Sequence, residues 1–160
     1  MTPSFRAILE VLNKHQVEHI VVGGVAAVIH GAPITTFDLD TLVRLDQENA
    51  ARLLKALSEL EARYREQEML LKPTQDDIMA GGHMLLMTRA GPLDVLGFIG
   101  DGQRYEDLQS SSSEVGMNFG MLRVLNLEEL IRQKKALGRS KDRAVADLLE
   151  EVLRNQEENS

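Results

Sequence analysis

The chain has 160 residues, no cysteine and a formal net charge of −7. The lack of cysteine excludes a disulfide framework, a thiolate zinc site and a cysteine nucleophile, and the acidic balance argues against broad binding to duplex nucleic acid, which needs a surface rich in Lys and Arg. The length suits one domain that buries about two-thirds of the surface of its unfolded chain. Residues 1–6 lack the basic stretch of a signal peptide, and no run reaches the roughly 18 apolar residues of a membrane span. We therefore expect a cytoplasmic protein that does not enter a membrane.

Hydrophobic periodicity and turn residues predict alternating helices and strands. In chain order the predicted elements are a helix over 4–14, a strand over 19–22, a short helix over 25–30, a strand over 39–45, a helix over 48–64, a hairpin of two strands over 84–88 and 93–99, an edge strand over 121–125 after a polar segment with four serines, and a helical pair from 127 onward that begins at the cap Asn126 and bends near Gly138. Breakers between residues 67 and 82 favour an irregular loop near the functional face.

This order of elements predicts an α/β (α+β) fold with a mixed β-sheet flanked by helices and a C-terminal helical pair. The predicted core spans residues 1–125. Residues 126–155 are expected to pack on the same domain as helices, and residues 156–160 to form a polar tail.

A glycine pair followed by two aspartates is the most informative pattern in the chain. Gly23 and Gly24 follow the apolar run 20–22, and Asp38 and Asp40, with one residue between them, stand where the next strand begins. Residues two apart on a strand point to the same face, so both carboxylates can hold one or two divalent ions. A glycine turn, for its part, suits a phosphate. Metal together with phosphate indicates phosphoryl chemistry.

Asp94 is a third carboxylate, within the apolar predicted strand over 93–99. A charge there is costly unless it is paired, solvated at a strand end or bound to metal. Three carboxylates can hold two metals about 3.5 to 4 Å apart, one activating an attacking hydroxyl and the other steadying a triphosphate and its leaving pyrophosphate. We expect Asp38, Asp40 and Asp94 to be catalytic ligands of Mg²⁺ or Mn²⁺, with Asp94 also suited to be the general base.

Each feature alone also fits a simpler interpretation. Paired aspartates often occur by chance or in a turn, and a glycine pair can serve backbone angles only. The basic residues Lys134, Arg139 and Lys141 are typical of a solvated helix end, although Arg and Lys are also the usual partners of phosphate oxygens. The four histidines lack the pattern of a zinc site and are expected to be structural or on the surface. Among them, His83 is the best placed for a substrate.

Four segments carry a resemblance to a known family. They are residues 21–26 (VVGGVA), Gly31 followed by residues 36–40 (TFDLD), residues 91–96 (GPLDVL), and Lys134 with residues 138–142 (GRSKD). Together they span most of the chain, from residue 21 to residue 142. The chain thereby resembles the nucleotidyltransferase fold of DNA polymerase beta type, in particular its small bacterial members related to the AbiEii toxin and the minimal nucleotidyltransferases.

The resemblance implies a mixed sheet flanked by helices and a nucleoside triphosphate as substrate. It implies that Asp38, Asp40 and Asp94 bind the metal. It further implies a set of nucleotide-binding positions on the glycine turn, the segment before the aspartates and the C-terminal helices: Gly23, Gly24, Thr36, Lys134, Arg139 and Lys141.

Two positions depart from the family pattern. Gly24 stands where many members have a phosphate-binding serine, although a glycine pair is common in the small bacterial branch. Ile34 stands where related sequences often carry an arginine.

Two functions of different classes follow. The first is a metal-dependent nucleotidyltransferase that moves a nucleoside monophosphate from an NTP to a hydroxyl of a protein, small molecule or tRNA and releases pyrophosphate. The alternative, motivated by Ile34, is a catalytically weak member of the fold that binds a nucleotide or a small antitoxin-like protein in a toxin–antitoxin pair. A third hypothesis is a phosphoesterase that uses the same carboxylates.

Overall fold

A single mixed sheet organises the chain in the computed structural model, which describes residues 3–66 and 71–159. The strand order is β3-β4-β5-β2-β1-β7-β6. Two neighbouring pairs, β1 with β7 and β2 with β5, are parallel, and the other pairs are antiparallel. The strands are β1 (His19–Val22), β2 (Leu39–Val43), β3 (Arg63–Tyr64), β4 (His83–Thr88), β5 (Gly91–Leu96), β6 (Ser112–Met117) and β7 (Gly120–Leu125). The predicted fold class is confirmed.

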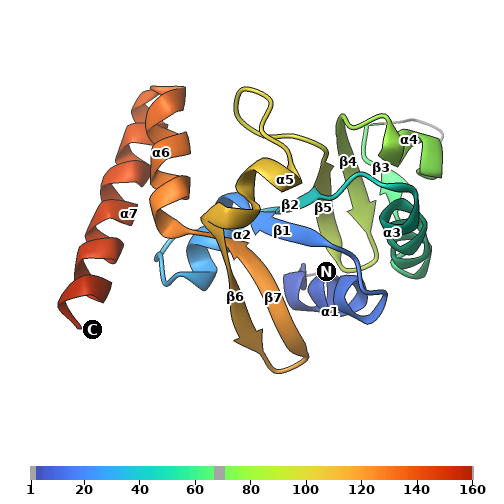
Figure 1. Ribbon diagram of the computed structural model, residues 1–160, viewed down its shortest axis with the longest axis horizontal. Helices are drawn as coiled ribbons and strands as arrows, with labels where there is room; N and C mark the ends of the chain where they lie inside the picture. The colour runs from blue at the N-terminus through green and yellow to red at the C-terminus, as the bar shows by residue number, and fades with distance from the viewer. Residues whose placement is uncertain (1–2, 67–70, 160) are drawn as a thin grey trace.

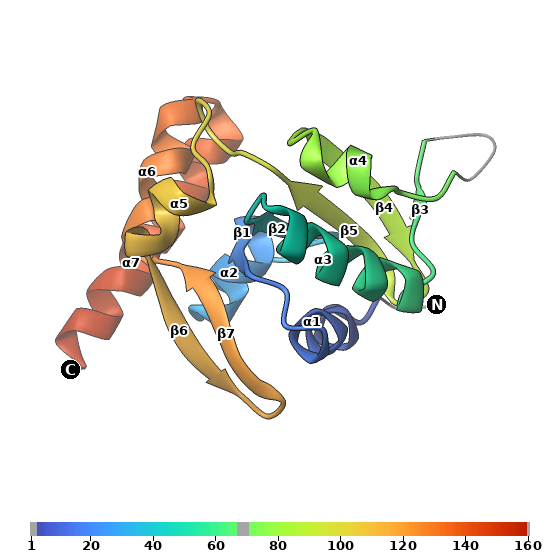
Figure 2. The same cartoon turned by 45° about the vertical axis from the view of Figure 1, so that its right-hand side comes forward.

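Helices pack around this sheet (Figure 1). They are α1 (Phe5–Lys14), α2 (Gly23–Ile29), α3 (Gln47–Glu59), α4 (Gln75–Met79), α5 (Tyr105–Leu108), α6 (Leu127–Leu137) and α7 (Ser140–Glu158), with a 3-10 turn at Gln109–Ser111. In both Figure 1 and Figure 2, α6 and α7 lie side by side at one end of the molecule, and β3, β4 and α4 lie at the other. No helix of the described residues is both long and apolar enough to cross a membrane.

The core forms because the apolar stripe of each helix meets the buried positions of the central strands. All four residues of β1 are buried. In α1 the residues Ile8, Leu9, Val11 and Leu12 are buried, which is the one-sided pattern expected of a helix that covers a sheet. The central strands β1 and β2 are thus anchored in the core, and the glycine pair and the aspartates lie at their ends.

Several predicted boundaries are wrong. The helix expected over 48–64 ends at Glu59, because Glu61 takes a left-handed conformation (φ 54°) and the N–H of Ala62 bonds back to the carbonyl of Leu57. The chain then enters β3. The segment expected to be irregular contains α4, which Thr74 caps by accepting the N–H of Asp77; residues 67–70 of that segment lie outside the described residues.

The C-terminal half also differs from expectation. The strand predicted as an edge, β7, lies inside the sheet between β1 and β6, and β6, which begins in the serine run, is the edge. The expected polar tail is helical to Glu158 because α7 continues through it. Asn126 does cap α6 by position, and the bend near Gly138 is confirmed by the left-handed conformation of that residue (φ 71°) between α6 and α7.

Candidate functional site

The register of the sheet brings the three predicted carboxylates together. In the parallel pair of β2 and β5, Asp40 lies directly opposite Asp94. Asp38 lies two residues before Asp40, immediately before β2 begins. One carboxylate oxygen from each of the three lies within 4.8 Å of the other two. Because Asp40 and Asp94 are on paired interior strands, backbone hydrogen bonds fix how close these two residues lie.

The glycine pair lies against these carboxylates, as the last residue of β1 pairs with Asp40. Gly23 begins α2 with φ of 67°, and a Cβ atom there would overlap the carboxylate of Asp40. A Cβ atom on Gly24 would lie only 2.6 Å from the Oγ1 atom of Thr36. Only glycine therefore lets the backbone approach both side chains this closely.

Thr36 joins this arrangement through its own hydrogen bond. Its hydroxyl donates to the carbonyl oxygen of Asp38 over 3.1 Å. The side chain of Thr36 therefore braces the segment before β2 while it lies close to Gly24 at the start of α2. Of the six positions implied for nucleotide binding, Gly23, Gly24 and Thr36 lie beside the carboxylate triad of Asp38, Asp40 and Asp94.

Burial and mutual repulsion shape the charge of the triad. Burial is the largest cause that raises the pKa of Asp40 to about 8, followed by the negative charge of Asp38 and the contact with Asp94. Burial and the charge of Asp94 also raise the pKa of Asp38. The Oδ1 atom of Asp40 is buried and has no hydrogen-bond partner among the described residues. Such an orphaned oxygen needs either a proton or a cation.

These features fit a divalent metal. The donors are carboxylate oxygens, which Mg²⁺ and Mn²⁺ prefer. The spread of the three oxygens is close to the distance across the coordination sphere of one Mg²⁺, roughly 4 Å for ligands at about 2.1 Å. The buried Asp40 oxygen would gain the partner that it lacks. Asp38, Asp40 and Asp94 are thus the residues that could hold the ion.

Arg65 is a member of the site that the sequence interpretation missed. Its Nη2 atom lies 2.7 Å from Oδ1 of Asp94, and its Nη1 atom donates to the carbonyl oxygen of Leu86 over 2.8 Å. The positive charge of Arg65 opposes the rise in the pKa of both Asp38 and Asp40. Residue 65 follows β3, a strand that the hydrophobic pattern did not predict, so the pattern carried no signal that placed an arginine here.

Two of the basic residues on the C-terminal helices lie against Asp142 and not against the triad. Arg139 forms a hydrogen-bonded ion pair with the buried Asp142 at 2.5 Å, and Lys134 lies 3.7 Å from the same carboxylate. This pairing lowers the pKa of Asp142 and raises that of Arg139. Lys141 is exposed in the first turn of α7. Within the described residues, no hydrogen bond or ion pair connects these three cations to the triad.

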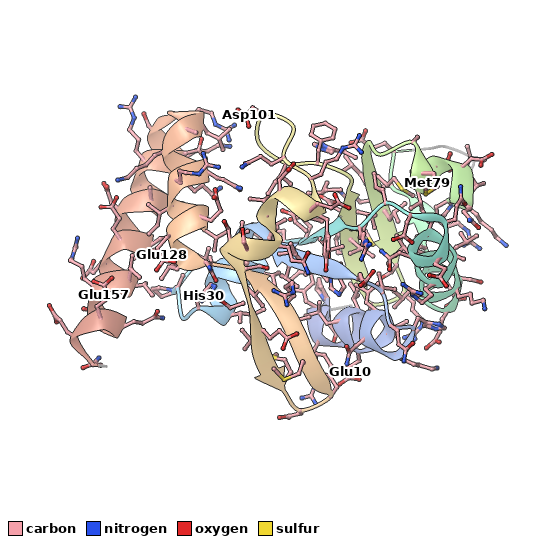
Figure 3. The ribbon with its side chains drawn as sticks, in the orientation of Figure 1. Glu10, His30, Met79, Asp101, Glu128 and Glu157 are labelled. Carbon is pink, nitrogen blue, oxygen red and sulfur yellow. The ribbon has the colours of Figure 1, made fainter. Side chains whose placement is uncertain are left out.

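The loop after β5 is tied to α6. Figure 3 shows Asp101 in this loop, which faces α6. The guanidinium of Arg132 donates to the side-chain oxygen of Gln103 over 3.0 Å and also pairs with Glu129. A surface cavity of about 420 Å³ lies between the loop and the helix.

The histidines take part in structural contacts. His19 is buried and bonds to Thr41, and its burial lowers its pKa to about 4. His15 pairs with Glu59, His30 contacts the carbonyl of Leu125, and His83 contacts the carbonyl of Phe98. These contacts agree with the structural role that the sequence predicted for them.

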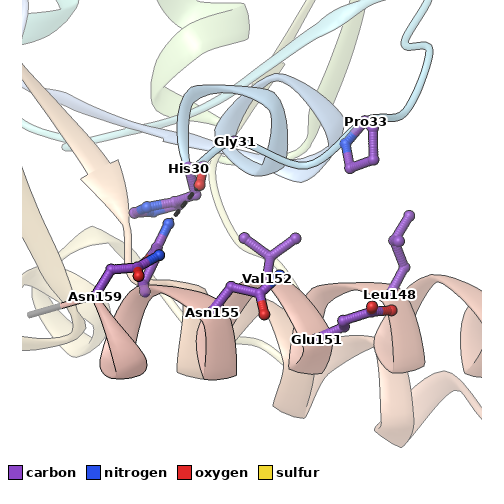
Figure 4. Close-up of a pocket in the computed structure, with 9 residues that line it drawn as sticks. His30, Gly31, Pro33, Leu148, Glu151, Val152, Asn155 and Asn159 are labelled. Atoms are coloured by element: carbon purple, nitrogen blue, oxygen red, sulfur yellow. Dashed lines mark hydrogen bonds between the residues drawn. The ribbon is translucent and has the colours of Figure 1, made fainter.

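A second cavity, of about 600 Å³, lies between α7 and the segment after α2 (Figure 4). His30, Gly31 and Pro33 line one side, and Leu148, Val152 and neighbouring polar residues of α7 line the other. The side chain of Gln156 closes one end by donating to the carbonyl of His30 over 2.6 Å. No residue of the carboxylate triad lines this cavity, so it is separate from the candidate metal site.

No family model matches the sequence, and a search of curated proteins returns no match. Solved structures do match, at low sequence identity. A candidate nucleotidyltransferase, TM1012 from Thermotoga maritima, is 20% identical with a TM-score of 0.56, over 98% of this chain and 91% of the other. The lincosamide antibiotic adenylyltransferase LnuA, solved with lincomycin bound, is 14% identical with a TM-score of 0.64, over 95% of this chain and 99% of the other.

A third neighbour is the antibiotic-resistance factor ANT(2'')-Ia, 15% identical with a TM-score of 0.56 over 97% of this chain and 90% of the other. At such identities the likeness shows the fold. The chain shares the fold of these nucleotidyltransferases along nearly its whole length.

Proposed function

We propose that the protein is a metal-dependent nucleotidyltransferase that moves a nucleoside monophosphate from an NTP to a hydroxyl acceptor and releases pyrophosphate. The observation that carries this proposal is the triad of Asp38, Asp40 and Asp94, with the orphaned buried oxygen of Asp40. The close approach of Gly23 to Asp40 supports it, because this approach brings the backbone of a glycine turn to the same point.

The carboxylates would hold Mg²⁺ or Mn²⁺, which supplies Lewis-acid activation of the phosphate when bound. Asp94 accepts the proton of the acceptor hydroxyl through its carboxylate. The freed oxygen attacks the α-phosphorus of the NTP, the bond from that phosphorus to the bridging oxygen breaks, and the electron pair leaves with pyrophosphate. Gly23 and Gly24 would lie near the phosphates, with Thr36 orienting the segment beside them.

Further cations are needed for a triphosphate, which carries several negative charges. Lys134, Arg139 and Lys141 are the candidates on the C-terminal helices. In the structure Asp142 is shared by Arg139 and Lys134. We propose that Asp142 positions both cations. Its single negative charge cannot neutralise both of them, so one positive charge remains to attract the phosphates of the nucleotide.

For the acceptor, we propose only its chemical class. The formal net charge of −7 disfavours long nucleic acid as acceptor and leaves a small molecule or a protein as the better choices. The names of two structural neighbours describe an antibiotic adenylyltransferase with lincomycin bound and an antibiotic-resistance factor. Lincomycin is therefore a sensible first small molecule to test.

The alternative function is a catalytically weak member of the fold that binds a nucleotide or a small antitoxin-like protein. Ile34 favours it, since this side chain packs against the core and offers no charge to a phosphate. Turnover separates the two functions. A nucleotide-binding member would bind NTP without releasing pyrophosphate.

The test is pyrophosphate release with each of the four NTPs and either Mg²⁺ or Mn²⁺, using lincomycin or a cell extract as the acceptor source. The wild type is compared with Asp38→Asn/Asp40→Asn, and with Asp147→Asn as a matched control on an exposed position of α7. We expect release by the wild type and the control, and a loss of at least about a hundredfold in the double variant, since it lacks two of three metal ligands. Release that persists in the double variant would refute the proposed site.

A further inference from the structure

Arg65 places a positive charge on the same carboxylate that the proposed function gives to a metal. We propose that Arg65 is a built-in counter-ion of the carboxylate triad, which holds the site together in the absence of metal and competes with the divalent ion for Asp94. This inference rests on the proposed function, since it takes the triad to be a metal site.

The register of the sheet puts Arg65 in line with the acids. Asp40 lies opposite Asp94, and Asp94 lies opposite Leu85 on β4. The N–H of Arg65 donates to the carbonyl of Leu85 over 3.0 Å, which continues the ladder between β3 and β4 by one residue. Residues opposite one another in a sheet share a face. The side chain of Arg65 therefore reaches over Leu85 to Asp94 on one face of the sheet.

The guanidinium is held at two points. One nitrogen lies 2.7 Å from Oδ1 of Asp94, and the other donates to the carbonyl of Leu86. The side chains of Arg65 and Asp94 are only 22% and 13% exposed, so solvent screens their attraction less than it screens a surface pair. The planar fork of arginine suits such a double contact, and its charge does not depend on pH in the physiological range.

A metal and this guanidinium would both bind the carboxylate of Asp94, and both are positively charged. Three carboxylates within 4.8 Å of one another repel strongly, and a cation at their edge relieves part of that repulsion. A divalent ion relieves it better, but whichever oxygen of Asp94 it binds, its positive charge is repelled by the guanidinium on the same carboxylate. Arg65 should thus stabilise the metal-free protein and weaken metal binding.

Arg65 is thus expected to raise stability without metal and to lower metal affinity. A purely structural role predicts a different result. A residue that only supports the fold would, when replaced, weaken stability and metal binding together. Replacement of Arg65 should lower the stability of the protein in a chelator while tightening its affinity for metal.

The experiment measures Mn²⁺ binding by titration calorimetry, and thermal unfolding in EDTA, for the wild type, Arg65→Gln and Arg65→Lys. Arg63→Gln is the matched control, because Arg63 lies two residues before Arg65, at the start of β3, is also partly buried and donates to the carbonyl of its neighbour Ala62. We expect Arg65→Gln to bind Mn²⁺ about tenfold more tightly than the wild type and to unfold at a lower temperature in EDTA. Arg65→Lys keeps the charge without the fork and should fall between them, and the control should bind Mn²⁺ as the wild type does.

Equal or weaker Mn²⁺ affinity in Arg65→Gln would overturn the inference; if that variant does not fold, the same result in Arg65→Lys would do so. Asp40→Asn identifies the site, since it should lose Mn²⁺ binding. Binding by the wild type that is lost in Asp40→Asn but unchanged on replacing Arg65 would refute the counter-ion while leaving the proposed function intact. No Mn²⁺ binding by any of the proteins would refute both.

Discussion

The pH dependence of stability in Asp40→Asn tests the electrostatics of the triad most directly. Burial, the charge of Asp38 and the contact with Asp94 raise the pKa of Asp40 from 3.8 to about 8 in the folded protein. In the unfolded chain this carboxyl titrates near its ordinary value. Between about pH 4 and pH 8 the folded state therefore binds more protons than the unfolded state, and folding becomes less favourable as the pH rises.

The size of the effect follows from the width of that window. Each pH unit inside it removes about 1.4 kcal/mol, so a rise from pH 5 to pH 8 removes up to about 4 kcal/mol from the metal-free protein. Asparagine has nearly the same shape as a protonated aspartate and carries no charge. We expect Asp40→Asn to match the wild type near pH 5 and to exceed its free energy of unfolding by about 2 to 4 kcal/mol at pH 8.5.

Urea denaturation followed by circular dichroism, in EDTA at pH 5, 6.5 and 8.5, measures these differences. The control is Asp147→Asn on the exposed side of α7, which should follow the wild type at each pH. Other groups that titrate, such as His19, are common to both proteins and cancel in the comparison. A difference between Asp40→Asn and the wild type that is the same at all three pH values, or a variant that is less stable at pH 8.5, would refute the reasoning.

Two further predictions concern the backbone and the buried histidine. Gly23→Ala should lower the free energy of unfolding by more than Gly31→Ala does, and it should abolish Mn²⁺ binding in calorimetry. Both glycines have positive φ (67° and 100°), which strains alanine by about 1 to 2 kcal/mol. Only at Gly23 would the new Cβ atom also overlap the carboxylate of Asp40. Equal effects of the two substitutions would show that the overlap is unimportant. Because burial lowers the pKa of His19 to about 4, the unfolded state binds more protons between that value and 6.5, so the wild type should lose about 3 kcal/mol as the pH falls through this range. His19→Gln, measured by urea denaturation, should lose clearly less, and an equal loss would contradict the assignment.

The parts of the site that the sequence predicted correctly depend on local spacing. Asp38 and Asp40 are two residues apart, and Asp94 interrupts an apolar strand, so both features are visible without knowledge of the fold. The resemblance implied that the three aspartates bind one metal site, but that β2 and β5 are neighbours could be seen only in the structure. The glycine pair was predicted from its place after β1, but the identity of the side chain that excludes a Cβ atom there could be seen only in the structure.

The parts that the sequence did not predict depend on contacts between distant residues. The end of α3 has the hydrogen bonds of a common helix terminus, yet glutamate stands where glycine is usual, so the pattern extended the helix to residue 64. That error hid β3 and with it Arg65. The edge strand β6 was hidden in a similar way: its first half is polar and none of its residues is buried, and its place follows from pairing with the apolar strand β7.

The division of the site between interior and edge strands has a mechanical consequence. Asp40 and Asp94 are on strands that have neighbours on both sides, so a shift of either would break two ladders. Arg65 follows an edge strand of only two residues, which pairs with β4 alone and is fastened by the hydroxyl of Tyr64, which donates to Asp77 over 2.8 Å. Since local opening is easiest where few backbone bonds must break, the cation can move while the acids stay in place. A metal that competes with Arg65 for Asp94 can therefore shift the arginine at the weakly held edge without moving the backbones of Asp40 and Asp94.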